Sequence, residues 1–99
     1  MIFKIKNEDI DIQISFRCDV LFENMMDKSF EGKNVTEWLA YFYASYLVAL
    51  GKNPENILEF DEFINELDQD RTMLLEFTQF YNEQMKRATK LRPRVEEKN

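Results

Sequence analysis

The feature that most constrains this fold is one long segment, Val35–Leu50, that is apolar on almost every side. It carries a single charged residue, Glu37, and Gly51 follows it directly. Glycine commonly stands just past the end of a helix. A helix that is apolar all round has to be covered on all sides. The rest of the chain, or a partner, must therefore supply elements that enclose this helix.

The first fifteen residues alternate in the manner of a β-hairpin. Apolar and basic residues take turns from residue 2 to residue 6, and isoleucines alternate with polar residues from residue 10 to residue 15. A period of two is typical of a strand with one buried face. We expect a hairpin over residues 2–15, with Asn7–Asp9 as its loop. Its apolar face needs cover from helices or another chain, because a lone hairpin is barely stable.

Helical spacing of apolar residues predicts three more helices, at about residues 17–28, 56–67 and 70–88. The second of these is expected to start near Asn53-Pro54, because proline is favoured in the first turn of a helix. Asp70 suits the N-cap of the last one. The expected fold is therefore α+β and mostly α, with an N-terminal β-hairpin packed on a small bundle of about four helices. We expect a single domain over residues 1–90 and a charged, flexible tail at 91–99.

The first of these helices carries two apolar groups of residues. Phe16, Val20, Leu21 and Met25 lie at helical spacing, and Phe22 with Met26 lies alongside. This spacing predicts an amphipathic helix.

Charge divides the chain into an acidic body and a basic arm. The net charge is −6, but residues 1–84 hold 7 basic and 17 acidic side chains, a net of −10. Residues 85–94 hold five basic side chains and no acid, among them Lys86, Arg87 and Lys90. Such an arm can be a solvated helix end favoured by the helix dipole, or it can dock on an acidic surface such as a second copy. Nucleic acid is the least favoured partner of so acidic a body, and we expect none.

The residue types needed for catalysis are poorly represented. The chain has no histidine, which removes the most common general base and metal ligand. Cys18 is the only cysteine, and we interpret it as a small apolar residue near the first helix. The carboxylates of the helix expected at residues 56–67 are spread over its polar face, where nothing suggests the burial that shifts a pKa. We expect no enzymatic activity, no cofactor and no bound metal.

Location follows from the same composition. A lone cysteine fits a reducing compartment, and the N-terminus has no pattern of a signal peptide. No segment approaches the roughly 20 apolar residues that span a membrane. We expect a cytoplasmic protein that does not interact with a membrane.

The side of Val35–Leu50 that carries Tyr41, Ala44 and Val48 allows two interpretations. These residues either belong to the core or form an intermolecular contact, and their spacing does not distinguish the two. A small residue such as Ala44 lets another helix approach closely, and Tyr is favoured where one end of the side chain stays wet. We hypothesise that the three residues contribute to a surface for self-association or for a client.

The order of these segments resembles a known family. A short hairpin is followed by the amphipathic segment 16–26, the apolar helix Val35–Leu50, an acidic helix around residues 58–67 and a last helix with a charged tail. This arrangement is similar to the tail assembly chaperones of long-tailed bacteriophages, especially those of phages and prophages of Gram-positive bacteria. The resemblance covers about residues 1–85 and rests on patterns of length and hydropathy.

The resemblance implies a function in the host cytoplasm. Chaperones of this family bind the tape measure protein, keep its hydrophobic stretches soluble and present it to tail tube subunits. They are absent from the finished particle and commonly self-associate. Many are also made as a longer product by ribosomal frameshifting. The tape measure protein, a second copy and the tail tube protein are therefore the partners that the resemblance implies.

Two other functions fit the same sequence. A structural head–tail or tail-completion component would remain in the phage particle. A small acidic inhibitor or regulator would bind a cationic partner in a tight one-to-one complex.

Overall fold

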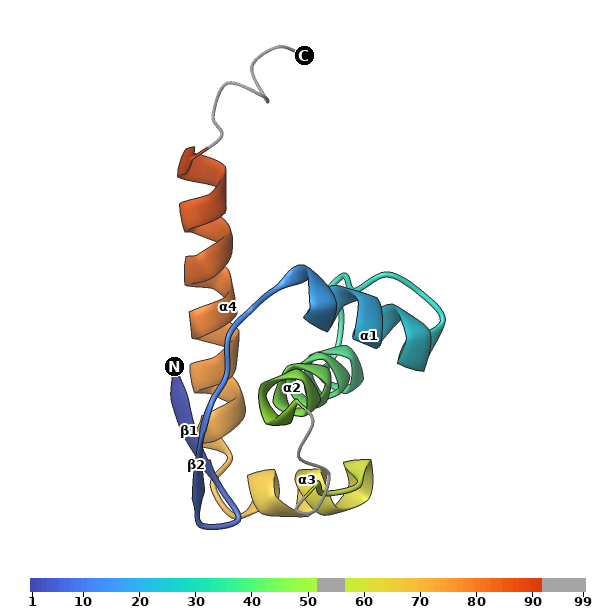
Figure 1. Ribbon diagram of the computed structural model, residues 1–99, viewed down its shortest axis with the longest axis vertical. Helices are drawn as coiled ribbons and strands as arrows, with labels where there is room; N and C mark the ends of the chain where they lie inside the picture. Colours follow the sequence, from blue (N-terminus) through green and yellow to red (C-terminus); the bar gives the residue numbers. More distant parts are fainter. Residues whose placement is uncertain (52–56, 92–99) are drawn as a thin grey trace.

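The computed structural model describes residues 1–51 and 57–91, without the side chains of residues 89–91. It confirms the predicted class, an α+β fold that is mostly α (Figure 1). The elements in chain order are β1 (Ile2–Ile5), β2 (Glu8–Asp11), α1 (Phe16–Met26), α2 (Val35–Leu50), α3 (Phe60–Asp68) and α4 (Thr72–Leu91). The predicted helix at 35–50 has the bounds of α2. The tail was predicted at residues 91–99, but Leu91 still belongs to α4. The rest of that tail and the helix start at Asn53-Pro54 lie outside the described residues.

The hairpin is tighter than its sequence suggested. Ile5 pairs with Glu8, so the loop is the two residues Lys6 and Asn7, and β2 begins inside the expected loop. Both loop residues have positive φ, 53° and 65°, as the tightest hairpin turns require. The alternation is confirmed in β1, where Phe3 and Ile5 are buried and the residues beside them are exposed.

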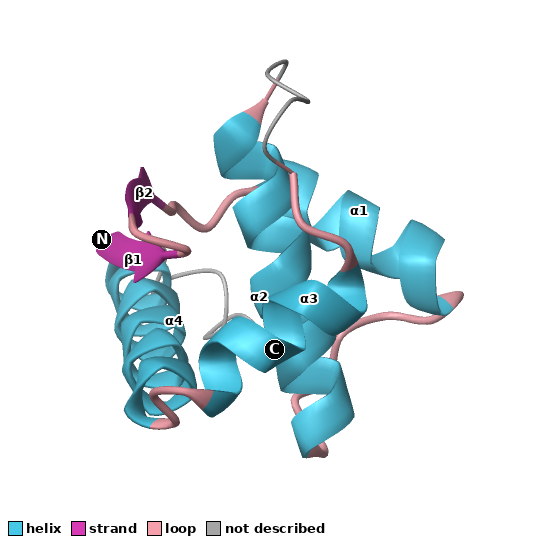
Figure 2. Ribbon diagram, turned by 90° about the horizontal axis from the view of Figure 1, so that it is seen from below, coloured by secondary structure: helices cyan, strands magenta, loops and turns pink. Residues whose placement is uncertain are grey.

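The expectation that other elements enclose the long apolar helix is confirmed for its middle. Every residue from 40 to 46 in α2 is buried. Figures 1 and 2 show α2 at the centre of the molecule, with α1 and α3 on opposite sides and α4 and the hairpin beside it. The enclosing elements belong to the same chain.

Aromatic rings join the elements around α2. The ring of Phe42 is stacked on that of Phe77 in α4, with centroids 4.3 Å apart and an interplanar angle of 11°. It also meets the edge of Phe3 in β1 at 5.0 Å and that of Phe63 in α3 at 5.2 Å. Each such pair adds about 0.5–1.5 kcal/mol to the energy of burial alone. Phe42 therefore ties the hairpin, α3 and α4 to the central helix.

Helix α3 starts later than predicted. Leu58 lies before the helix in non-helical backbone, and its N–H donates to the Tyr46 hydroxyl at 3.1 Å. The Tyr43 hydroxyl donates to the Leu58 carbonyl at 2.7 Å. The peptide groups of Leu58 are thus satisfied by α2 side chains instead of by a helix. The helix begins after Glu59, whose side chain forms a capping box with Glu62.

Helix α4 begins at Thr72, two residues after the predicted cap. The Asp70 carboxylate accepts hydrogen bonds from the Thr72 N–H at 3.2 Å and from its hydroxyl at 2.6 Å. Asp70 therefore still binds the first residue of the helix, from one position before the N-cap. The C-terminal part of α4 extends beyond the rest of the molecule (Figure 1). None of the helices described is long and apolar enough to cross a membrane.

Candidate functional site

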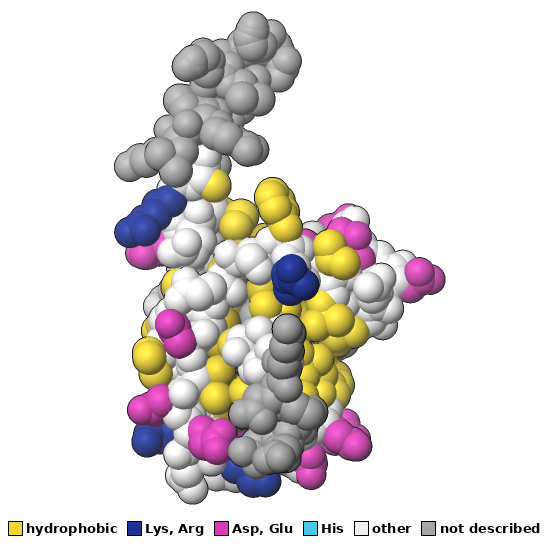
Figure 3. All heavy atoms as spheres, viewed as in Figure 1, with side chains coloured by type: hydrophobic (Ala, Val, Ile, Leu, Met, Phe, Trp, Pro, Cys, Tyr) yellow, Lys and Arg dark blue, Asp and Glu magenta, His cyan; other side chains and the backbone are white. Residues whose placement is uncertain are grey.

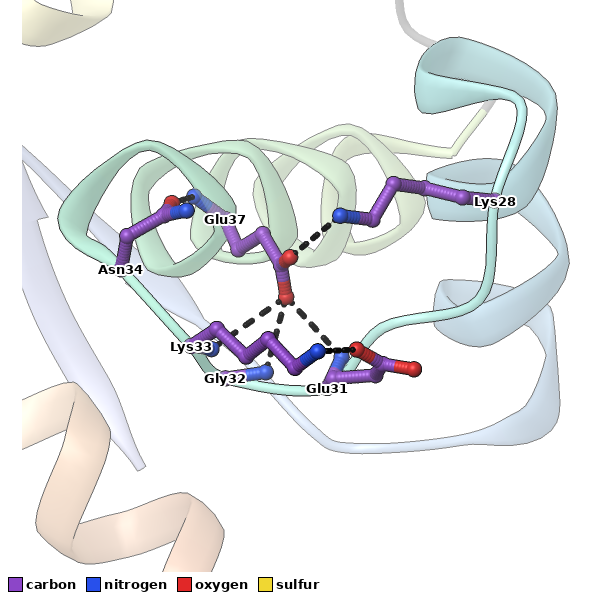
Figure 4. Close-up of polar contacts among 6 residues, drawn as sticks. All are labelled: Lys28, Glu31, Gly32, Lys33, Asn34 and Glu37. Carbon is purple, nitrogen blue, oxygen red and sulfur yellow. Dashed lines mark hydrogen bonds and ion pairs between the residues drawn. The ribbon is translucent and has the colours of Figure 1, made fainter.

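A buried carboxylate is the first candidate for a functional group. Glu37, in the first turn of α2, is only 1% exposed. Its Oε2 accepts a hydrogen bond from Lys28 Nζ at 2.6 Å. Its Oε1 accepts from the backbone N–H groups of Glu31, Gly32 and Lys33, at 3.0, 2.9 and 3.4 Å (Figure 4). Every partner belongs to the loop before α2, so the carboxylate ties this loop to the helix.

The loop is shaped for this contact. Gly32 has a φ of 68°, and a Cβ atom there would lie 3.2 Å from the Trp38 ring. Only glycine fits such a position without strain. The side chain of Asn34 caps α2 by accepting from the Glu37 N–H at 2.9 Å. The segment is therefore built around Glu37, a role that the sequence did not reveal.

The electrostatics of Glu37 suit a structural role and not acid–base catalysis. The hydrogen bond from Lys28 and those from the backbone of Glu31 and Lys33 lower the pKa of Glu37 from its ordinary value of 4.5 to about 2. A general acid or base at neutral pH needs a pKa near 7. Glu37 stays ionised at neutral pH, and its oxygens are occupied.

The lowered pKa predicts a loss of stability in acid. A group whose pKa is lower in the folded state stabilises the fold above its unfolded pKa, and this contribution disappears as the pH falls. For Glu37 the loss is expected as the pH falls from about 5 to 2, the window set by the two pKa values. Urea unfolding of the wild type and of Glu37→Gln at several pH values measures it. The gap between the two proteins should be widest near pH 7 and narrow below pH 4; a constant gap would contradict the prediction.

The second candidate is an apolar groove between α1 and the projecting end of α4. It has a volume of about 610 Å³, and we call it the α1–α4 groove; its lining residues are Ile14, Ser15, Phe16, Asp19, Gln84, Met85 and Ala88. Phe16 is 85% exposed, and Val20, one turn further along α1, is 56% exposed. Figure 3 shows hydrophobic side chains gathered on this face between α4 and α1. Large apolar residues grouped on a surface indicate a site for another molecule.

One carboxylate lies within this apolar surface. Asp19 is half-buried, and its Oδ1 accepts a hydrogen bond from the Tyr41 hydroxyl at 2.5 Å. Burial, and then the hydrogen bond to Asp19, raise the pKa of Tyr41 far above its ordinary value. The hydroxyl therefore keeps its proton and remains a donor to Asp19.

The structure places two of the hypothesised contact residues in the core. Tyr41 and Ala44 are both 0% exposed. The ring of Tyr41 packs against Phe22 of α1 and against Phe77 and Tyr81 of α4. Of the two interpretations of these residues, the structure supports the core. Val48, nearer the end of α2, is half-buried and packs against the core cluster.

Lys86 and Arg87, the two basic residues of the arm whose side chains are described, do not line the groove. Lys86 and Arg87 are exposed on α4. At 100° per residue they lie on the side of the helix opposite Met85 and Ala88, which line the groove. The backbone of Lys90 continues α4, and its side chain lies outside the described part. The predicted site residues therefore form no single surface, and the groove was not predicted.

The sequence did not show which apolar stripe of α1 faces the core. In the structure Cys18 and Phe22 face it and are fully buried, whereas Phe16 and Val20 are exposed. Two apolar stripes on one short helix were the available signal, since only one of them can face a core. Among the described residues, no group of three or more acidic or cysteine side chains is placed to hold a metal ion.

Comparison with protein-family models, with curated proteins and with solved structures finds no match to this chain.

Proposed function

We propose that this protein is an assembly chaperone that binds an apolar helical segment of a client in the α1–α4 groove. Following the resemblance of the sequence, the proposed client is the tape measure protein of a long-tailed phage. The observation that carries the proposal is the exposed Phe16, which extends from α1 beside the apolar face of the projecting α4.

The chemistry of the groove favours a helical client. Ile14, Phe16, Met85 and Ala88 offer apolar contact, and the α4 wall of the groove is one turn of a straight helix. An amphipathic helix laid along such a wall buries its apolar face in the manner of other groove-binding helices. The net charge of −6 keeps a protein with an exposed apolar patch from precipitating. A chaperone for hydrophobic segments needs both properties.

Phe16→Ser is expected to abolish most client binding while the protein stays folded. Phe16 contributes little to the fold at 85% exposure, whereas full burial of a Phe by a client is favourable by about 1.5–3 kcal/mol. We expect affinity to fall about tenfold to a hundredfold. Co-expression with the tape measure protein, scored by how much of that protein is soluble and co-purifies, measures the effect.

The matched control is Val35→Ser, because Val35 is also exposed, at 62%, and lies outside the groove. It should leave co-purification unchanged. Equal loss in both variants would indicate a nonspecific effect of surface hydrophobicity. No co-purification of the tape measure protein with the wild type would refute the proposed function.

A second copy is the other occupant that this test detects. If light scattering finds an oligomer that Phe16→Ser converts to a monomer, then the groove is an interface between copies and the client binds elsewhere. Presence of the protein in purified phage particles would instead favour a structural component over a chaperone.

A further inference from the structure

Among the described residues that line the α1–α4 groove, Asp19 is the only charged one, and the others are apolar or neutral. The other lining residues offer methyl, methylene and aromatic groups, one hydroxyl and one amide. A carboxylate that is partly removed from water in such a place is costly unless a partner compensates it. Asp19 forms no ion pair with any residue in the described part of the chain. The compensating cation is therefore absent from these parts of the protein.

A hydrogen bond from the core holds the side chain of Asp19 in place. Tyr41, which is fully buried in α2, donates its hydroxyl to Oδ1 at 2.5 Å. Asp19 is half-buried and lines the groove, and no hydrogen bond to its other oxygen, Oδ2, is found among the described residues. Asp19 thus places a carboxylate, held by Tyr41, in the lining of the groove. A fixed carboxylate loses less entropy on pairing than a mobile one.

We propose that Asp19 determines which helices the groove accepts, by pairing with one Lys or Arg at the edge of the apolar face of the bound helix. This inference rests on the proposed function and adds the chemistry of its ligand: an amphipathic helix with a cation beside its apolar stripe. Tyr41 acts as a positioning residue for Asp19. The −10 net charge of residues 1–84 favours the approach of such a cationic helix.

Two synthetic helical peptides of identical composition provide the probe. Each has the same Leu stripe and one Lys, placed in one peptide at the edge of the stripe and in the other on the polar face. Fluorescence anisotropy measures their binding to the full chain. We expect the stripe-edge peptide to bind about tenfold more tightly, because a charge-assisted hydrogen bond distinguishes them. Raised salt should reduce this preference.

Asp19→Asn is expected to remove the preference while keeping an oxygen that accepts from Tyr41. Tyr41→Phe should weaken it, because Oδ1 loses its donor. Glu23→Gln is the matched control, since it removes the same charge from an exposed position of α1 outside the groove. It should keep the preference.

Equal affinity for both peptides, a preference that survives Asp19→Asn, or no binding of either peptide would overturn the inference. The proposed function fails separately. Client binding that depends on Phe16 but not on Asp19 would support the proposed chaperone function and refute the selectivity proposed for Asp19. If the peptides show the selectivity but the tape measure protein does not bind, the selectivity proposed for Asp19 is supported and the tape measure protein is refuted as the client.

Discussion

Replacing Ala44 by Glu is expected to unfold the protein. Ala44 is 0% exposed in the middle of α2, within a run of seven buried residues. A longer side chain has no space there, and an ionised carboxylate buried without a partner costs several kcal/mol. A small domain is stable by only about 5–15 kcal/mol in total. Glu is itself a good helix former, so the effect comes from burial and not from helix propensity. Far-UV circular dichroism and the dispersion of an amide NMR spectrum measure it.

The same substitution at Ala49 is the matched control. Ala49 lies five residues further along the same helix and is exposed. Ala49→Glu should leave the spectra and the unfolding midpoint nearly unchanged. A folded Ala44→Glu protein that fails to self-associate would contradict the burial and restore the contact surface hypothesised for this side of α2.

The central position of α2 could be predicted because its sequence leaves no polar side to face water. The hairpin was predictable for a similar reason, since a period of two assigns Phe3 and Ile5 to one face and Lys4 to the other. These patterns depend on residues close in sequence. They therefore predict the buried face of an element whatever the arrangement of the other elements.

The start of α3 could not be predicted, because contacts distant in sequence decide it. Tyr43 and Tyr46 bind the backbone of Leu58 from twelve to fifteen residues away. No local pattern shows that a hydroxyl will replace the hydrogen bonds of a helical turn. The buried Glu37 was missed for the same reason, since its partners lie in a loop whose path depends on the fold.

The groove was missed because α1 has two apolar stripes and only packing decides between them. Cys18 and Phe22 face α2, and Phe22 lies 5.9 Å from Tyr41 between ring centroids. That choice leaves Phe16 and Val20 outside, where they become available to a partner. The spacing of four residues is the same in both pairs. The sequence therefore shows that one stripe is unpaired without showing which one.

Phe77→Ala is expected to have the second largest effect on stability. Phe77 is 0% exposed and is the residue of α4 that stacks on Phe42. Its ring also lies 6.1 Å from that of Phe3 and 6.2 Å from that of Tyr41, measured between centroids. Removing a buried Phe side chain costs about 3–5 kcal/mol, through lost burial and the cavity that remains. Chemical denaturation should show a lower urea midpoint with little change in slope.

The comparison with Leu75→Ala and with Phe16→Ser separates stability from binding. Leu75 is 57% exposed on the same helix, so its truncation should shift the midpoint little; an equal shift would contradict the assignment of Phe77 to the core. Phe77 holds α4 on α2, and α4 supplies Met85 to the groove. Phe77→Ala should therefore weaken ligand binding only as far as it lowers the folded fraction. Phe16→Ser should weaken binding in a fully folded protein, because that side chain touches the ligand and leaves the core intact.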